Sequence, residues 1–179
     1  MPNKIYTKKG DSGTTSLLSG RRVPKIFPEI KAVGALDELN SFVGLLMTEY
    51  QDEKEILKSI QWDLFIAGST IINDNNSELQ VITQDDIRDL EVSMDEMSSN
   101  LPDLDNFILP NGNKAQTYAH ICRTICRRAE VEVLNCLVLD NAMRVTIITQ
   151  YLNRLSDFFF VLARYIGHKE NVNETLWKT

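Results

Sequence analysis

An unbroken apolar periodicity near the end of the chain restricts the possible folds more than any other feature. The pattern from about Met143 to Gly167 predicts one long helix, because its apolar residues step by four and three. These residues are Ile148, Leu152, Leu155, Phe159, Leu162 and Ile166. Such a seam is typical of a helix packed inside a bundle. Asn153, Arg154 and Asp157 interrupt it, and because buried polar groups need partners, they form either an internal network or part of a site.

Four further segments carry the same spacing, so the whole chain predicts an all-α fold of five helices. These segments run over about 30–50, 54–72, 84–99 and 114–134. Thr83 followed by Asp86 is the pattern of an N-cap and predicts where the third helix begins. With 179 residues, no internal repeat, no separating linker and no convincing sheet, the chain suits a single domain.

The helix predicted over 114–134 combines a core stripe with a charged face. Residues of the stripe recur at three- and four-residue steps: Tyr118, Cys122, Ile125, Cys126, Ala129 and Val133. Arg123, Arg127 and Glu130 stand at i, i+4 and i+7 and therefore share another face. Two guanidiniums beside a carboxylate suit an anion, because arginine presents a rigid fork to phosphate oxygens. The alternative is a solvated basic face with an i, i+3 ion pair.

The first 31 residues differ in charge from the rest of the chain. The net charge of −6 disfavours nucleic acid as a partner, yet residues 1–31 hold seven basic groups against two acidic ones, so their +5 leaves −11 elsewhere. Residues 4–7 predict a short extended piece, and a loop of glycines and hydroxyls follows over 8–16. Backbone N–H groups and hydroxyls of such a loop can wrap a small polyanion, although the Walker A spacing is absent. The alternative is a flexible terminal arm.

A polar stripe is also predicted on the helix over about 30–50. Asp37, Asn40, Ser41 and Gly44 fall on one face, away from the apolar core positions. Small and polar residues there permit close approach by a ligand or by another helix. A half-buried polar stripe between two helices is an equal alternative.

The remaining composition predicts a cytoplasmic protein with no membrane segment. The longest wholly apolar run is Phe158–Ala163, far shorter than a membrane span, and no signal region begins the chain. Three cysteines, two of them one helical turn apart on the apolar stripe, are typical of small core residues in a reducing compartment. His120 and His168 form no ligand pattern with them, so no protein metal site is expected.

Four separated blocks occur together in an order that identifies a family. The blocks are 5–18, 33–41, 107–130 and 151–157, and they include the strings Arg-Arg-Ala-Glu and Tyr-Leu-Asn-Arg-Leu-Ser-Asp. In this order the chain resembles the PduO-type ATP:cob(I)alamin adenosyltransferases over nearly its whole length. Two stretches depart from the family pattern. Asn111-Gly112-Asn113 replaces the more common Gly-Gly pair, which suggests a stiffer loop, and residues 137–150 are atypical.

The resemblance implies an up-and-down five-helix bundle with ferritin-like packing, assembled as a homotrimer. ATP and the corrinoid would bind at each interface between subunits. The single domain 1–179 would comprise a basic ATP-binding arm over 1–31, the helical bundle over 32–167 and a C-terminal tail over 168–179. The implied reaction transfers the 5′-deoxyadenosyl group of ATP to the Co(I) centre of reduced cobalamin, forming adenosylcobalamin and releasing tripolyphosphate.

The resemblance also implies roles for individual residues. The nucleotide-binding loop would consist of Thr7, Lys8, Lys9, Gly10, Thr15, Ser16 and Lys25. The rest of the ATP site would consist of Arg127, Arg128, Glu130 and Asn153. Asp37 and Arg123 match a charge pair that bridges neighbouring subunits beside the active site. Phe107 matches the aromatic residue on the lower face of the corrin, so the catalytic set would be Asp37, Phe107, Arg123 and Arg127.

The chemistry of this reaction fits a chain that lacks a histidine-centred triad. Co(I) is a strong nucleophile, so the protein must mainly supply position and charge stabilisation, with Mg²⁺ on the phosphates. A flavoprotein reductase and an adenosylcobalamin-dependent enzyme are the expected protein partners. One alternative, a carboxylate-bridged di-metal bundle, requires Glu-x-x-His pairs that His120 and His168 do not form. The other is a non-catalytic module that binds ATP and cobalamin and delivers the cobalamin.

Overall fold

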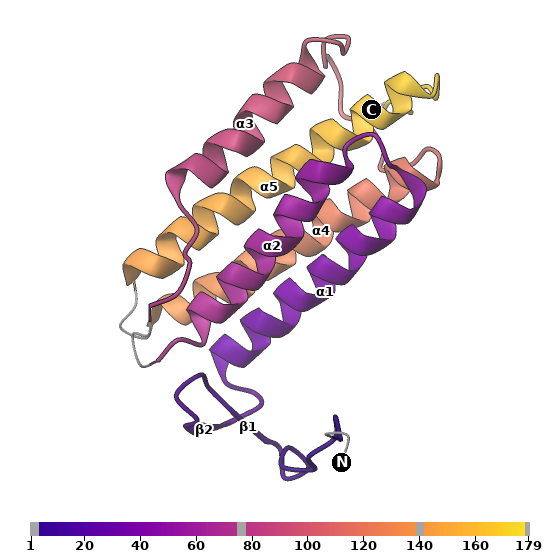
Figure 1. The fold of residues 1–179 in the computed structure, drawn as a ribbon. Coiled ribbons are helices and arrows are strands. Elements are labelled where there is room, and N and C mark those ends of the chain that lie inside the picture. Colours follow the sequence, from indigo (N-terminus) through magenta and orange to yellow (C-terminus); the bar gives the residue numbers. More distant parts are fainter. Residues whose placement is uncertain (1–3, 75–77, 139–141, 178–179) are drawn as a thin grey trace.

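Five helices lie side by side in a computed structural model that describes residues 4–74, 78–138 and 142–177 (Figure 1). The helices are α1 (Pro28–Glu49), α2 (Lys54–Ile71), α3 (Gln84–Ser98), α4 (Lys114–Leu134) and α5 (Ala142–Lys169). A short 3-10 helix, Asn135–Val138, follows α4 directly. Ahead of α1, β1 (Thr14–Ser16) and β2 (Arg22–Pro24) form an antiparallel hairpin. The expected all-α bundle of five helices is confirmed.

The helices pack in an up-and-down arrangement around one core. α1 packs against α2 and α4, whereas α5 packs against α4 and α3. Lys114, the first residue of α4, pairs with Glu49, the last residue of α1, at 3.9 Å. Later in α4, Arg128 bonds Glu38, which lies earlier in α1. These two ion pairs show that α1 and α4 run antiparallel. The seam predicted on α5 is fully buried between its neighbours, which confirms it as the centre of the bundle.

The starts of α1 and α3 follow local sequence signals, whereas no local signal predicted the strands of the hairpin. The predicted cap is confirmed, because Asp86 Oδ2 accepts from the backbone N–H of Thr83 at 2.7 Å and from its hydroxyl at 2.8 Å. Pro28 begins α1 slightly earlier than predicted, at a position where its fixed φ suits a helix. The extended piece expected over 4–7 is not a strand. The strands lie further on and were missed, because three-residue strands show no periodicity and depend on pairing across the turn.

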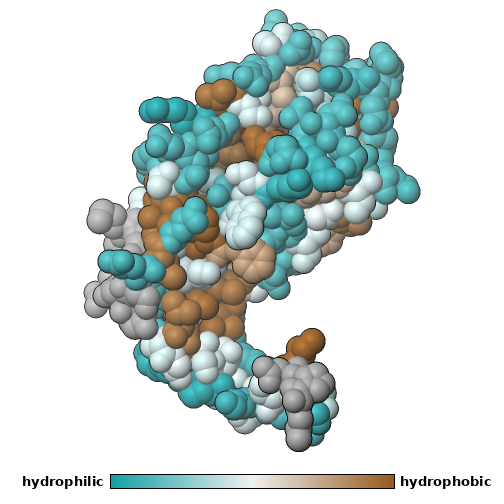
Figure 2. All heavy atoms as spheres, viewed as in Figure 1, coloured by the Kyte–Doolittle hydropathy of each residue, from teal (hydrophilic) through white to brown (hydrophobic). Residues whose placement is uncertain are grey.

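Hydrophobic side chains remain on the surface, gathered on the half of the bundle nearest the hairpin (Figure 2). On α2 the exposed fractions of Trp62 and Phe65 are 72% and 66%. Phe65 also lines a groove of about 420 Å³ between α1 and α2, together with Asp37 and Gly68. Within the described ranges, no helix has the length and hydropathy needed to cross a membrane. Exposed aromatic side chains gathered on one helix are typical of a surface that contacts another molecule.

A buried acid joins α2 to α5. The hydroxyl of Tyr151, which is fully buried, donates to Asp63 Oδ2 at 2.8 Å. Burial raises the pKa of Asp63 from 3.8 to about 6, the hydrogen bond from Tyr151 opposes this rise, and the charges of Asp86 and Asp89 add to it. The ionised carboxylate is thus the unfavourable form inside the fold.

Asp63→Asn should stabilise the protein at pH 8 and lose that advantage at pH 4. The folded pKa lies above the unfolded one, so the wild type loses stability as the pH rises from about 4 through about 6. A shift of this size corresponds to about 2–3 kcal/mol, whereas asparagine still accepts from Tyr151 and carries no charge. Urea denaturation of both proteins at pH 4 and pH 8 measures the difference, with exposed Asp85→Asn as control. A difference that does not change with pH would contradict the assignment.

Candidate functional site

Residues 8–16, which lead into and include β1 and are called the hairpin loop below, bring several predicted phosphate ligands together. The backbone N–H of Lys25 donates to the carbonyl of Gly13 at 2.9 Å, which extends the pairing of β1 and β2 by one residue toward the loop. The ammonium group of Lys25 lies against Gly10, where a Cβ added to the glycine would be only 3.2 Å from Lys25 Nζ. Lys8 adopts a φ of 58°, in the left-handed region that side chains rarely occupy. Lysine charges, hydroxyls and glycine backbone therefore gather in one small turn, as an anion-binding loop requires.

An acid at the end of α2 anchors this hairpin to the bundle. Asp74 accepts from the backbone N–H of Ser19 at 3.1 Å, from the Ser19 hydroxyl at 2.8 Å and from Arg21 Nε at 3.1 Å. Beside it, the N–H of Leu18 donates to the carbonyl of Ile72 at 3.2 Å. Asp74 was not predicted, because it stands 55 positions from Ser19 and no local pattern marks it. The hairpin thus has a defined attachment to the helices.

The charged face of α4 divides between two neighbouring helices. Asn153 Nδ2 on α5 donates to Glu130 Oε1 at 3.3 Å, so two residues assigned to the ATP site do meet. Arg128 turns toward α1 and bonds Glu38 there. Arg127 is exposed, and within the described part of the chain its guanidinium has no hydrogen bond or ion pair. It is therefore available to an anion from outside the chain.

Arg123 and Asp37 do not meet each other in the folded chain. Arg123 is half-buried and its Nε has no hydrogen-bond partner in the described structure. Burial, then the charge of Arg127, lower the pKa of its guanidinium below the usual range. Asp37 is exposed on α1, and among the described residues its carboxylate has no side-chain partner. A partly buried cation without an anion is unfavourable, so this position suits a carboxylate or phosphate from another molecule.

The polar residues predicted on α1 and α5 have different surroundings in the fold. On α1, Asn40 exchanges hydrogen bonds with Gln61 of α2, each side chain donating to the other's backbone carbonyl at 3.1 Å. Packing between helices therefore explains Asn40, as one of the two alternatives predicted. On α5, Asn153 and Asp157 are exposed rather than part of a buried network. Arg154 instead forms ion pairs with Asp157 at 3.1 Å and with Glu91 of α3 at 3.0 Å.

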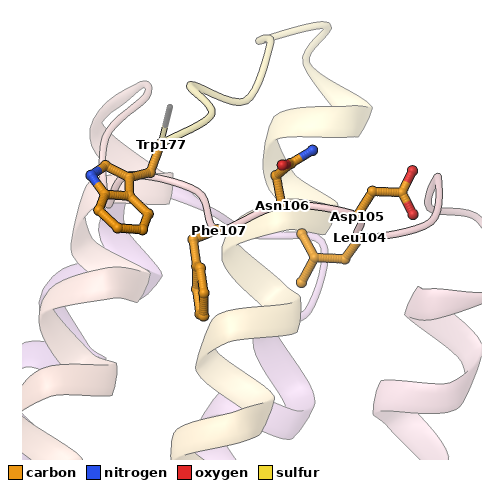
Figure 3. A pocket seen from close by; sticks show the side chains of 5 residues that line it. All are labelled: Leu104, Asp105, Asn106, Phe107 and Trp177. Carbon is orange, nitrogen blue, oxygen red and sulfur yellow. The ribbon is translucent and has the colours of Figure 1, made fainter. Parts of the chain in front are cut away.

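The loop before α4 presents an exposed aromatic pair. Phe107 has an exposed fraction of 75%, and its ring lies edge-on to Trp177 with 6.1 Å between the centroids (Figure 3). The N–H of Trp177 donates to the carbonyl of Phe107 at 2.7 Å, which ties the C-terminal segment to this loop. Both rings line a hollow of about 460 Å³ with Leu104, Asp105 and Asn106. Trp177 was not predicted, since only this pairing across 70 positions brings it to Phe107.

Asn111-Gly112-Asn113, which departs from the family pattern, fixes the end of the Phe107 loop at the start of α4. Asn113 caps α4, since its Oδ1 accepts from the N–H of Gln116 at 2.9 Å while Gln116 Oε1 accepts from the N–H of Asn113 at 3.0 Å. Gly112 has a φ of 133°, and a Cβ there would lie 2.3 Å from Gln116 Oε1. Glycine is therefore needed beside this cap.

In the other atypical stretch, 137–150, α5 begins at Ala142, and residues 139–141 lie outside the described residues.

The hairpin and the aromatic pair lie at opposite ends of the bundle. The hairpin precedes the first residue of α1, whereas the Phe107 loop precedes α4, whose first residue pairs with the last residue of α1 (Figure 1). The 22 residues of α1 place its two ends about 33 Å apart. A single chain therefore does not bring its own hairpin to its own Phe107.

Comparison with known proteins decides the family. The family model described as cobalamin adenosyltransferase matches residues 5–166. The chain belongs to the cobalamin adenosyltransferase family. The family and the fold expected from the four sequence blocks are therefore confirmed.

Individual members of the cobalamin adenosyltransferase family match nearly the full chain. A cobalamin adenosyltransferase from Cupriavidus metallidurans is 41% identical, over 98% of this chain and 95% of the relative. A corrinoid adenosyltransferase from Bacillus subtilis is 36% identical, over 96% of this chain and 90% of the relative. A solved structure of a variant PduO-type ATP:corrinoid adenosyltransferase from Lactobacillus reuteri, complexed with cobalamin and ATP, has a TM-score of 0.91 at 32% identity. The match covers 98% of this chain and 100% of the chain in the solved structure.

Proposed function

We propose that this chain transfers the 5′-deoxyadenosyl group of ATP to Co(I) of reduced cobalamin. The observation that carries the proposal is the hairpin loop, in which Lys25 lies over Gly10 within a chain that matches the cobalamin adenosyltransferase family over 5–166. A loop of this kind suits the triphosphate of a nucleotide. The solved relative with a TM-score of 0.91 was obtained with cobalamin and ATP, which supports the same pair of substrates here.

The reaction needs charge stabilisation more than acid–base catalysis. Co(I) gives an electron pair to the 5′ carbon of ATP, the bond from that carbon to its phosphate oxygen breaks, and tripolyphosphate leaves with the electrons. Negative charge therefore grows on the phosphate chain, and we assign its stabilisation to Lys8, Lys25 and Arg127. The exposure of Arg127 and the position of Lys25 against Gly10 support this assignment. Glu130, held by Asn153, is the group that orients the ribose or a guanidinium.

A magnesium ion fits this arrangement as a companion of the nucleotide. Mg²⁺ commonly binds through substrate phosphates with one or two carboxylates and keeps several waters. Over residues 4–25, Asp11 is the sole acidic side chain, and it lies in the hairpin loop. The donor set therefore suits a metal held mainly by the triphosphate. The ion would supply positive charge to the leaving group.

We infer that the complete site takes residues from more than one copy of the chain, assembled as a homotrimer. The hairpin and Phe107 are separated by the length of α1, while Arg123 and Asp37 both lack partners within the described residues. The exposed Trp62 and the groove between α1 and α2 offer apolar surface for such contacts. A cytoplasmic location, a flavoprotein reductase as electron donor and an adenosylcobalamin-dependent enzyme as recipient belong to the same proposal.

An anaerobic assay with ATP, chemically reduced cobalamin and Mg²⁺ tests the proposed function. We expect the spectrum of a cobalt–carbon bond and release of one tripolyphosphate per adenosylcobalamin formed. Omission of ATP provides the control. Binding of both substrates without tripolyphosphate release would instead identify a delivery module that does not catalyse the transfer.

Phe107→Ala should impair reduction more than adenosyl transfer. An apolar ring below the corrin would exclude water and the nucleotide-loop base from Co(II), and a cobalt without axial donors is easier to reduce. The high exposure of Phe107 leaves it available for this contact, and its loss creates no buried cavity. Rates are measured from Co(II) with a mild reductant and, separately, from Co(I) supplied chemically. Phe107→Leu, which keeps an apolar side chain, is the matched control. Equal losses of Phe107→Ala in both assays would show that Phe107 only shapes the pocket.

A further inference from the structure

One side chain joins both ends of the hairpin loop. Arg22 lies opposite Ser16 in the strand register, and its guanidinium reaches across β1. Its Nη2 donates to the carbonyl oxygens of Lys9 at 2.5 Å and Thr14 at 3.1 Å, and also to the Thr14 hydroxyl. Its Nη1 donates to the Ser16 hydroxyl at 3.2 Å. The fork of one arginine therefore fixes the start and the end of the loop relative to each other.

These bonds also orient hydroxyl groups of the loop. A hydroxyl has one donor and two acceptor positions, so a hydroxyl that accepts from a guanidinium keeps its own hydrogen for another partner. The Ser16 hydroxyl accepts from Arg22 in this way, so the hydroxyl hydrogen of Ser16 points away from the guanidinium and is free to be donated. An anion held in the loop would then receive a hydrogen bond from Ser16.

The charge of Arg22 is not neutralised within the described structure. Its hydrogen-bond acceptors are carbonyl and hydroxyl oxygens, and no ion pair joins it to a carboxylate among the described residues. The neighbouring Arg21 pairs with Asp74 at 3.1 Å and so anchors the hairpin to α2. The two adjacent arginines therefore differ in what they hold: Arg21 holds the hairpin to the bundle, and Arg22 holds the loop in shape.

We propose that Arg22 is a positioning residue that keeps the hairpin loop in the shape that receives the triphosphate of ATP. This inference rests on the proposed function, because it assigns the ligand of the loop. A residue that contributed charge alone could be replaced by lysine. Lysine carries a single ammonium group, however, and cannot bridge Lys9, Thr14 and Ser16 with the planar fork that the contacts require.

The test compares Arg22→Lys and Arg22→Ala with the wild type. Arg88→Ala is the control, since Arg88 is exposed on α3 and makes only a long ion pair of 3.9 Å. With Co(I) supplied chemically, we expect the KM for ATP to rise about tenfold in both Arg22 variants, as for the loss of one to two hydrogen bonds with a charged donor. The KM for cobalamin and the melting temperature should stay at wild-type values. Hydrogen exchange of the amides over 9–16, measured without ATP, should be faster in both variants.

A wild-type KM for ATP in Arg22→Lys would overturn the proposal, because charge alone would then suffice. Unchanged amide exchange in both variants would overturn it as well, since the loop would hold its shape without Arg22. If the wild-type protein fails to form adenosylcobalamin, the proposed function is wrong. Inorganic tripolyphosphate is then the probe, and unchanged affinity for it in Arg22→Lys would overturn the positioning role independently.

Discussion

Arg127→Ala should lower kcat/KM for adenosyl transfer at least about tenfold. Loss of a charged contact to the leaving phosphate chain costs on the order of 2–4 kcal/mol of transition-state stabilisation, and 1.36 kcal/mol is a factor of ten. Within the described structure Arg127 is exposed and has no hydrogen bond or ion pair of its own. The substitution therefore leaves no group of the fold unpaired, so the effect on rate should appear without loss of stability.

Steady-state kinetics with Co(I) supplied chemically measure this effect, alongside thermal unfolding of the same protein. Arg88→Ala again serves as a matched loss of one exposed arginine on a different helix. Added magnesium or higher ATP should not restore the rate if Arg127 acts on the transition state. Kinetics close to those of the wild type would remove Arg127 from the site and leave its exposed guanidinium as ordinary surface.

Exchange of the charges at Asp37 and Arg123 should restore part of what either single change removes. Asp37→Arg or Arg123→Asp alone places two like charges together wherever the residues meet across a subunit boundary. Each single variant should therefore lose activity or weaken the assembly. The half-buried Arg123 has an unpartnered Nε, so its partner must come from outside the described residues or from a bound anion.

A double-mutant cycle, scored by activity and by sedimentation, measures the coupling. Residues in contact should show a coupling of about 1 kcal/mol or more. Asp37→Arg paired with Arg88→Asp gives the control, since Arg88 lies on α3 and should not couple. Additive defects in Asp37→Arg and Arg123→Asp would show that the two residues never touch, and the proposed interface would lose its main support.

The helices and the Thr83 cap of α3 were predictable because their signals are local. The helix expected over 114–134 is observed as Lys114–Leu134, since its apolar residues recur within one helical turn and Asn113 caps its first turn. Arg123, Arg127 and Glu130 could be placed on one face for the same reason. The hairpin strands were missed, because their pairing is absent from any three-residue window.

Contacts between distant residues could not be derived in the same way. Ser19 and Asp74 stand 55 positions apart, and Arg128 and Glu38 stand 90 positions apart. The first pair joins the turn of the hairpin to the segment after α2, and the second joins α4 to α1, so each forms only when distant parts of the chain pack together. The part of the site that depends on them, including the attachment of the hairpin and the direction of Arg128, was therefore beyond prediction from residue spacing.

The sequence by itself determined the five helices, the basic glycine-bearing loop and the family, since periodicity, composition and ordered motifs are properties of short stretches. Only the tertiary structure decided which groups remain available for a ligand. Arg127 stays unpaired among the described residues while Arg128 bonds Glu38, although the two arginines are adjacent in sequence. The reason is rotation by about 100° per residue along α4, which turns one guanidinium outward and the other toward α1.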